Sequence, residues 1–192
     1  MQPNTDPIVR GQKVWLRGFT EEDVDPYSRF VNTSHALWAG YTTPQPIDKV
    51  HDLRETFRKE HGKDAYYFVV SPLGSDDFLG MTWVWNLHSR IGGAEFSIYM
   101  ADPGQWGGGL GTDATAATLD FVFGYTEITR LWLTTSEHNV RAQRSFEKSG
   151  FVREGLLRET MTWQGNPLNV VFMAILRREW EALERPRSWD LS

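Results

Sequence analysis

The residues best suited to chemistry form a glycine-rich run, Gly107-Gly108-Gly109-Leu110-Gly111, which follows an expected strand and opens an expected helix. Each glycine costs conformational entropy on folding, so four of them in one run need a structural reason. Unpaired backbone N–H groups converge at the positive end of a helix dipole, and such a nest binds phosphate without lysine side chains. The run therefore predicts a site for a phosphate-bearing ligand, with a flexible surface turn as the alternative.

The sequence around this run narrows the choice of phosphate ligand. A nucleoside-triphosphate loop needs Gly-Lys-Ser/Thr, and the run contains no lysine. Residues 109–114 fit the dinucleotide pattern G-x-G-x-x-A. However, residues 102–108 separate the strand from these glycines, and only about half a domain follows, so a nicotinamide cofactor ranks second. The pyrophosphate of coenzyme A is the remaining candidate.

Composition excludes several other classes of function. The chain has 192 residues, which suits one domain, and its net charge is −5 with no basic run, so we expect no nucleic-acid partner. It has no cysteine, which excludes disulfides, zinc–thiolate sites and a cysteine nucleophile. Its five histidines are scattered, so we expect no metal. No stretch approaches the roughly 18 apolar residues of a membrane span, and residues 1–7 lack a signal-peptide core. We expect a cytoplasmic protein with no membrane contact.

Periodicity predicts the elements that position the glycine run. Thr20 and Asp23 resemble a capping box, and Gly150 is placed to end a helix. Expected helices lie at about 20–31, 47–61, 112–125 and 139–148, and expected strands at 13–19, 65–71, 78–86, 94–101, 128–136, 151–159 and 168–176. Antiparallel hairpins come first and strand–helix–strand units follow. This order predicts a mixed sheet with helices on both faces.

Several motifs resemble the GNAT acetyltransferase superfamily. Residues 99–114, Tyr-Met-Ala-Asp-Pro-Gly-Gln-Trp-Gly-Gly-Gly-Leu-Gly-Thr-Asp-Ala, resemble its motif A, in which a strand leads into Gln/Arg-x-x-Gly-x-Gly/Ala. Residues 136–142 and 146–151 resemble motif B, and the likeness continues at 11–17, 22–23, 152–158 and 178–180. The resemblance spans nearly the whole chain and is closest to the branch that includes ribosomal-protein N-terminal acetyltransferases.

The resemblance implies an α/β, single-domain GNAT fold over residues 1–192, with flexible tails at 1–7 and 185–192. Its core is a twisted, mixed but mostly antiparallel sheet of about seven strands. The implied activity is transfer of an acetyl group from acetyl-CoA to a primary amine by direct attack in a ternary complex. The acceptor is an amine-bearing small molecule or a peptide N-terminus. A non-catalytic acyl-CoA sensor or interaction module of the same fold is the alternative.

The resemblance also implies which residues hold acetyl-CoA. Main-chain groups of the strand end pair with the pantetheine arm, amides of the glycine run hold the pyrophosphate, and the motif B helix closes the site. These residues are Tyr99, Met100, Ala101, Trp106, Gly107, Gly108, Gly109, Leu110, Gly111, Thr112, Asn139 and Phe146. Trp106 replaces the usual Gln or Arg, and Gly108 stands where Lys or Arg is common. The run thus lacks a basic side chain, which predicts weaker CoA affinity. Asn139 is equally well explained as a helix N-cap.

Catalytic groups are implied less completely. Glu95 matches a common family glutamate and is our candidate base, although pairing with an arginine is nearly as good an explanation. His138 is the second candidate, with a structural role as its alternative. Phe146 stands where many relatives have a tyrosine acid, and Ala142 where the ribosomal branch often has serine. A positioned acid typically adds about 10²–10⁴-fold, so we expect a slow enzyme or one using water or the substrate as acid.

The sequence says least about which residues recognise the acceptor. Trp38, Tyr41 and Trp85 are candidate walls of the acceptor pocket, although ordinary packing explains each one as well. The acyl group beyond acetyl and the oligomeric state stay open, and a Trp-rich surface is compatible with a homodimer.

Overall fold

The computed structural model describes residues 9–31, 33, 63–89 and 92–191. The expected helix at 47–61, the candidate walls Trp38 and Tyr41, and the expected tail at 1–7 lie outside these ranges. No helix within the described ranges is long and apolar enough to cross a membrane.

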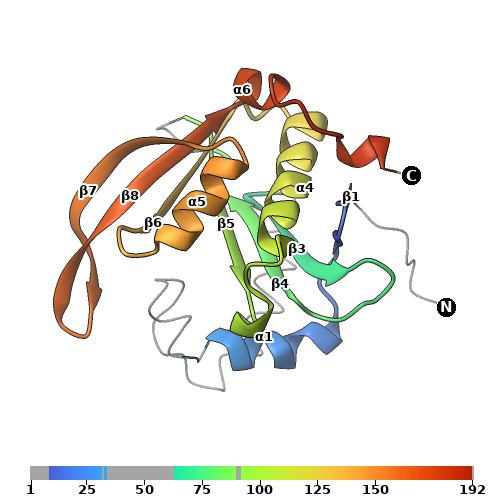
Figure 1. Ribbon diagram of the computed structural model, residues 1–192, viewed down its shortest axis with the longest axis horizontal. Helices are drawn as coiled ribbons and strands as arrows, with labels where there is room; N and C mark the ends of the chain where they lie inside the picture. Colours follow the sequence, from blue (N-terminus) through green and yellow to red (C-terminus); the bar gives the residue numbers. More distant parts are fainter. Residues whose placement is uncertain (1–8, 32, 34–62, 90–91, 192) are drawn as a thin grey trace.

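Within the described ranges, the centre of the fold is one open sheet of eight strands in the order β1-β2-β3-β4-β5-β6-β8-β7 (Figure 1). All neighbouring strands are antiparallel except β5 and β6, which are parallel, so the expected mixed sheet is confirmed. The strands are β1 (Val9–Arg10), β2 (Val14–Arg17), β3 (Ala65–Pro72), β4 (Gly80–Trp85), β5 (Ala94–Met100), β6 (Arg130–Ser136), β7 (Val152–Trp163) and β8 (Asn166–Leu176). Strand β1 was not predicted, because its two residues are too few to show a periodicity.

Helices cover both faces of the sheet, as expected. The α-helices of the described residues are α1 (Val24–Val31), α4 (Leu110–Tyr125), α5 (Val140–Lys148) and α6 (Arg177–Glu181). On one face α4, α5 and α6 bury Leu119, Phe146 and Trp180 against the sheet. On the other face Phe30 and Val31 of α1 pack on β3, β4 and β5. Each face of β5 therefore meets a different helical layer.

The chain enters α1 through the expected capping box. The Thr20 N–H and hydroxyl both donate to Asp23, at 2.7 and 2.9 Å. Arg17 at the end of β2 donates to both oxygens of Asp23, at 2.8 and 2.7 Å. Because this ion pair is buried and fully hydrogen-bonded, it fixes where α1 crosses the sheet.

The described part of the expected C-terminal tail makes specific contacts with α4. Arg185 donates to both carboxylate oxygens of buried Asp120 in α4, and Ser188 donates to the same group. Trp189 lies on Tyr125 and Trp180 at 6.1 and 6.3 Å between ring centroids. The polar composition of the segment did not announce these bonds to one carboxylate, and they favour an attached segment over a flexible tail.

The hairpin of β7 and β8 is longer than the pattern predicted. Gln164 and Gly165 form a two-residue turn with φ of 48° and 80°, the left-handed geometry that suits hairpins. Asn166 and Pro167, which precede the expected strand at 168–176, pair with Trp163 and Thr162. Register shifts interrupt β7 between Arg153 and Gly155 and between Leu157 and Met161.

The parallel pair β5–β6 separates soon after it forms. Only Ala94 and Glu95 of β5 pair with β6, although β5 continues to Met100. The Ala101 N–H donates to Leu79 next to β4, at 2.8 Å. Because backbone groups alternate along a strand, the N–H and C=O of Met100 point to the opposite edge, where β6 has separated. On the β6 side, pairing between described strands therefore stops after the first two residues of β5.

Candidate active site

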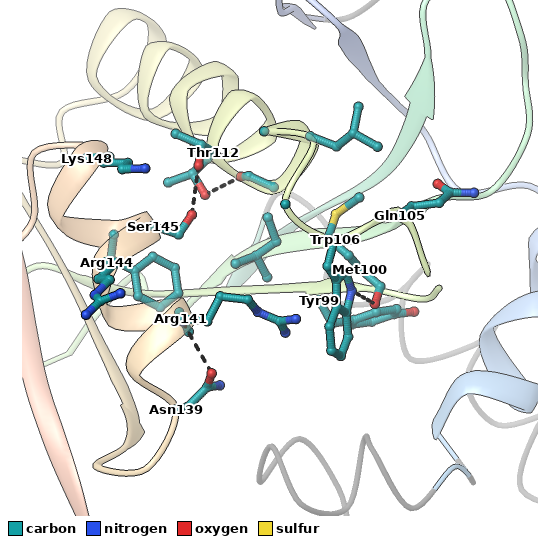
Figure 2. Close-up of a pocket in the computed structure, with 18 of the residues that line it drawn as sticks. Tyr99, Met100, Gln105, Trp106, Thr112, Asn139, Arg141, Arg144, Ser145 and Lys148 are labelled. Atoms are coloured by element: carbon teal, nitrogen blue, oxygen red, sulfur yellow. Dashed lines mark hydrogen bonds between the residues drawn. The ribbon is translucent and has the colours of Figure 1, made fainter. Parts of the chain in front are cut away.

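A pocket of about 420 Å³ opens between the second half of β5, the N-terminus of α4 and one face of α5 (Figure 2). It is lined by Ile98, Tyr99, Met100, Gln105, Trp106, Gly107, Gly109, Leu110, Gly111, Thr112, Thr115, Asn139, Val140, Arg141, Ala142, Arg144, Ser145, Phe146 and Lys148. Of the residues predicted to bind the cofactor, only Ala101 and Gly108 are not in this lining. The structure therefore gathers segments from three parts of the chain around one cavity.

The glycine run forms the expected amide nest. Gly107 and Gly109 have φ of 89° and 83°, which side chains tolerate poorly. Gly109 is the N-cap of α4, and the Asp113 N–H makes the first bond of the helix, to the Gly109 carbonyl at 2.9 Å. The amides of residues 110–112 precede that bond and have no place in the helical ladder. All three residues line the pocket, so the positive end of the α4 dipole faces it.

Asp113 holds the nest against the N-terminal strands. Its carboxylate accepts the backbone N–H groups of Gln12, Lys13 and Val14 at 3.0, 2.8 and 3.0 Å. Lys13 also donates its ammonium to the Gly108 carbonyl at 2.7 Å. The turn between β1 and β2 is therefore bonded directly to the start of α4.

Replacing Asp113 by alanine is expected to lower the free energy of unfolding by about 1–3 kcal/mol. The change leaves three backbone donors without an acceptor, and Val14 is fully buried. Urea unfolding measures the change, with Asp64→Ala as a control because Asp64 is exposed. Equal stability of the two variants would contradict an anchoring role.

Positive charge reaches the pocket from α5. Arg141, Arg144 and Lys148 all line it, and the described lining contains no carboxylate. The glycine run lacks a basic side chain, as its sequence indicated, but the pocket as a whole is cationic. Sequence reasoning missed these residues, although their spacing of three and four positions was a readable sign of one helix face.

Asn139 and Phe146 both reach the pocket from α5. The Asn139 side chain accepts the Ala142 N–H at 3.3 Å, which confirms the N-cap role. Phe146 is 7% exposed and packs edge-on against Phe96 at 6.3 Å between centroids. Phe146 thus forms part of the apolar floor of the pocket.

Glu95 lies on the opposite face of β5, outside the pocket. Strand alternation puts it on the side of Tyr99, which packs on α1. It is the last β5 residue paired with β6, opposite Trp132. Partial burial raises the pKa of Glu95 to about 7, while a hydrogen bond from the Asn86 amide at 3.1 Å opposes that rise. No arginine pairs with Glu95 among the interactions found within the described ranges, and a carboxyl titrating near neutrality suits a base.

The two remaining predicted site residues that the structure describes, His138 and Trp85, are exposed. The His138 side chain is 61% exposed and 3.9 Å from the Glu137 carboxylate. Trp85, 40% exposed, is the β4 partner of Glu95. Trp85 therefore lies beside the candidate base, whereas His138 does not line the pocket. Metal-ligating side chains form no cluster in the part of the chain that the structure describes.

Comparison with known proteins identifies the family. The sequence profile described as "Acetyltransferase (GNAT) domain" matches residues 13–152. The chain belongs to the GNAT acetyltransferase family. It is 29% identical over 187 residues to an aminoglycoside N(6')-acetyltransferase type 1 of Klebsiella pneumoniae, covering 91% of this chain and 87% of that protein. It is 26% identical over 171 residues to a spermidine N(1)-acetyltransferase of Escherichia coli (strain K12), covering 88% and 89%.

Solved structures show the same fold. The spermidine N-acetyltransferase from Vibrio cholerae, solved in complex with CoA and spermine, aligns with a TM-score of 0.78 and 23% identity, covering 88% of this chain and 98% of that one. The family match makes this GNAT protein an acyl-CoA-dependent N-acetyltransferase with acetyl-CoA as its cofactor. The names of these relatives do not point to the ribosomal-protein branch that the motifs suggested.

Proposed function

We propose that this GNAT enzyme acetylates a primary amine of a small polycationic acceptor, of the polyamine or aminoglycoside kind. The position of Glu95 carries the proposal. It faces away from the cofactor pocket, at the point where β5 and β6 separate, so an amine beside it can approach an acetyl group held along β5. Aminoglycoside and spermidine acetyltransferases are among the relatives, and both accept amines that are cations at neutral pH.

The protein contributes orientation and proton removal to the proposed reaction. Bound acetyl-CoA supplies an activated acetyl thioester. The second half of β5, which lines the pocket, orients the arm that carries it, and the amides of residues 110–112 hold phosphate. Glu95 removes a proton from the acceptor ammonium, directly or through one water, because only the neutral amine is a nucleophile. His138 stays a second candidate for the same role.

The two positions at which relatives carry an acid for the departing thiolate hold Ala142 and Phe146 in this chain. Phe146 has no proton to give, and the Ser145 hydroxyl bonds to Thr112 at 2.8 Å on the α4 side of the pocket. A thiol has an unperturbed pKa of about 8.5, so a thiolate leaves without full protonation. We therefore propose that water or the substrate serves as the acid.

Several predictions from the sequence remain proposals. The chain forms one domain, the protein acts in the cytoplasm, and a peptide N-terminus of the ribosomal-protein type is the alternative acceptor. A homodimer also stays a prediction. Trp85 beside Glu95 favours a cationic acceptor, because an exposed indole binds ammonium groups through its π face.

An amine panel tests the proposed acceptor class. Thiol release from acetyl-CoA is measured with spermidine, kanamycin, a Ser-Ala-starting peptide and no amine. Release that depends on a polyamine or an aminoglycoside is the expected result. Release with the peptide alone would move the acceptor to protein N-termini. CoA binding without release for any of these amines would contradict the proposed acceptor class.

A further inference from the structure

An arginine of α5 lies stacked on the tryptophan of the glycine loop. The guanidinium carbon of Arg141 is 3.4 Å from the centroid of the Trp106 ring, well within the roughly 6 Å range of cation–π contacts. The ring is held in turn by its Nε1, which donates to the Met100 carbonyl at 3.3 Å. Figure 2 shows the Arg141 side chain extending from α5 toward Trp106. The stack therefore sets the guanidinium between the end of β5 and the amide nest.

The position of Arg141 within α5 calls for a reason other than helix stability. Arg141 is the second residue of the helix, where the dipole is positive and a cation is unfavourable. A phosphate group at this point would be favoured by both the guanidinium and the positive end of the α5 dipole.

Two more cations continue the same face of α5 away from Trp106. Arg144 and Lys148 follow Arg141 by three and seven positions, and all three line the pocket. The Ser145 hydroxyl between them bonds to Thr112 in the first turn of α4 at 2.8 Å. Going along the pocket from Trp106, one therefore meets the Arg141 guanidinium, then the α4 amides next to Ser145, and then Lys148.

We propose that α5 supplies the positive charge for coenzyme A that the glycine run lacks. Arg141, held on Trp106, binds the pyrophosphate together with the α4 amides, and Arg144 with Lys148 binds the 3′-phosphate. The N–H groups of a stacked guanidinium lie in a plane parallel to the indole ring. They point outward from the edge of the guanidinium, where they can donate to phosphate oxygens. Trp106 is then a platform for a cation in place of the usual polar side chain. This inference rests on the use of coenzyme A and not on the acceptor.

Calorimetric titration without any amine tests the assignment. The probes are CoA, dephospho-CoA, which lacks the 3′-phosphate, and pantetheine, which lacks all phosphates. Arg141→Ala is expected to weaken CoA and dephospho-CoA equally, by about 10- to 100-fold, and to leave pantetheine unchanged. Trp106→Leu should reproduce most of that loss, and the double variant should add little to it. Arg144→Ala/Lys148→Ala should weaken CoA but not dephospho-CoA.

Matched controls separate a phosphate contact from a general effect. Arg158→Ala removes the same charge from exposed β7 and should change no affinity. Arg141→Lys keeps the charge but loses the planar stack, so its CoA affinity should fall between those of wild type and Arg141→Ala. Melting temperatures of the free variants show that each one folds.

Three results would overturn the assignment. Equal weakening of pantetheine by Arg141→Ala would make the residue a contact of the arm. Tighter CoA binding by Arg141→Ala or Trp106→Leu would mean that the stack closes the pocket of the free enzyme. Losses no larger than that of Arg158→Ala would remove α5 as the source of charge.

Discussion

Glu95→Gln is expected to lower kcat/KM for acetyl transfer by about 10²–10⁴-fold, the usual contribution of a positioned base. Glutamine keeps the size of the side chain and the hydrogen bond with the Asn86 amide group, but it cannot accept a proton from an ammonium. Steady-state kinetics with the acceptor found in the amine panel measures the loss. CoA affinity should stay unchanged, because Glu95 lies outside the cofactor pocket.

The pH profile should carry the same signature. Glu95 acts as a base only when ionised, and burial raises its pKa to about 7. The wild-type kcat/KM should therefore fall as the pH drops through about 7, and Glu95→Gln should lack this inflection. Glu127→Gln, which removes an exposed carboxylate beyond α4, should keep it. A full rate and an unchanged profile for Glu95→Gln would move the base to His138 or to water.

Stability gives an independent measure of the same pKa. The folded pKa of Glu95 lies above its unfolded value of 4.5, so the folded state binds the proton more tightly. The resulting stabilisation is complete below about pH 4.5 and is lost as the pH rises through about 7. Glu95→Gln should therefore lose less thermal stability than wild type between pH 5 and pH 8. A parallel loss in both would mean that Glu95 titrates normally.

Most of the fold could be predicted because its signals are local. The capping box at Thr20 and Asp23, the N-cap at Asn139 and the glycine at position 109 each act within one helical turn. The elements that were missed have weak local signals. β1 has two residues and α6 has five, which is too short for a hydrophobic period to show.

Only the part of the candidate site that consists of backbone amides could be predicted from the sequence. The amide nest follows from the order strand, glycines, helix, and the structure places it as expected. The stack of Arg141 on Trp106 joins residues 35 positions apart, and nothing in either local sequence announces the contact. The raised pKa of Glu95 depends in the same way on burial by the surrounding chain. A single sequence does not reveal contacts between distant elements or the dielectric environment of a side chain.

Asp120→Ala is expected to lower the free energy of unfolding by about 3–5 kcal/mol, the usual result of breaking a buried ion pair from one side. Its carboxylate, 2% exposed, accepts from Arg185 at 2.6 and 3.0 Å and from the Trp180 indole at 2.9 Å. It also accepts the backbone N–H and hydroxyl of Ser188 at 2.8 and 3.1 Å. Urea unfolding at pH 7 measures the loss.

Two further variants show whether the C-terminal segment is part of the folded domain. Arg185→Ala should cost less than Asp120→Ala, because the Trp180 and Ser188 donors remain and the Arg185 side chain is already 24% exposed. Deletion of residues 185–192 should also destabilise the protein, since it removes Arg185, Ser188 and the Trp189 ring that covers Trp180. A flexible tail would instead leave the unfolding midpoint of the truncated protein unchanged. Asp120 belongs to the helix whose first turn forms the amide nest, so destabilisation in either variant would extend to the cofactor site. Because CoA binds only the folded state, adding it should raise the lowered unfolding midpoint part of the way back.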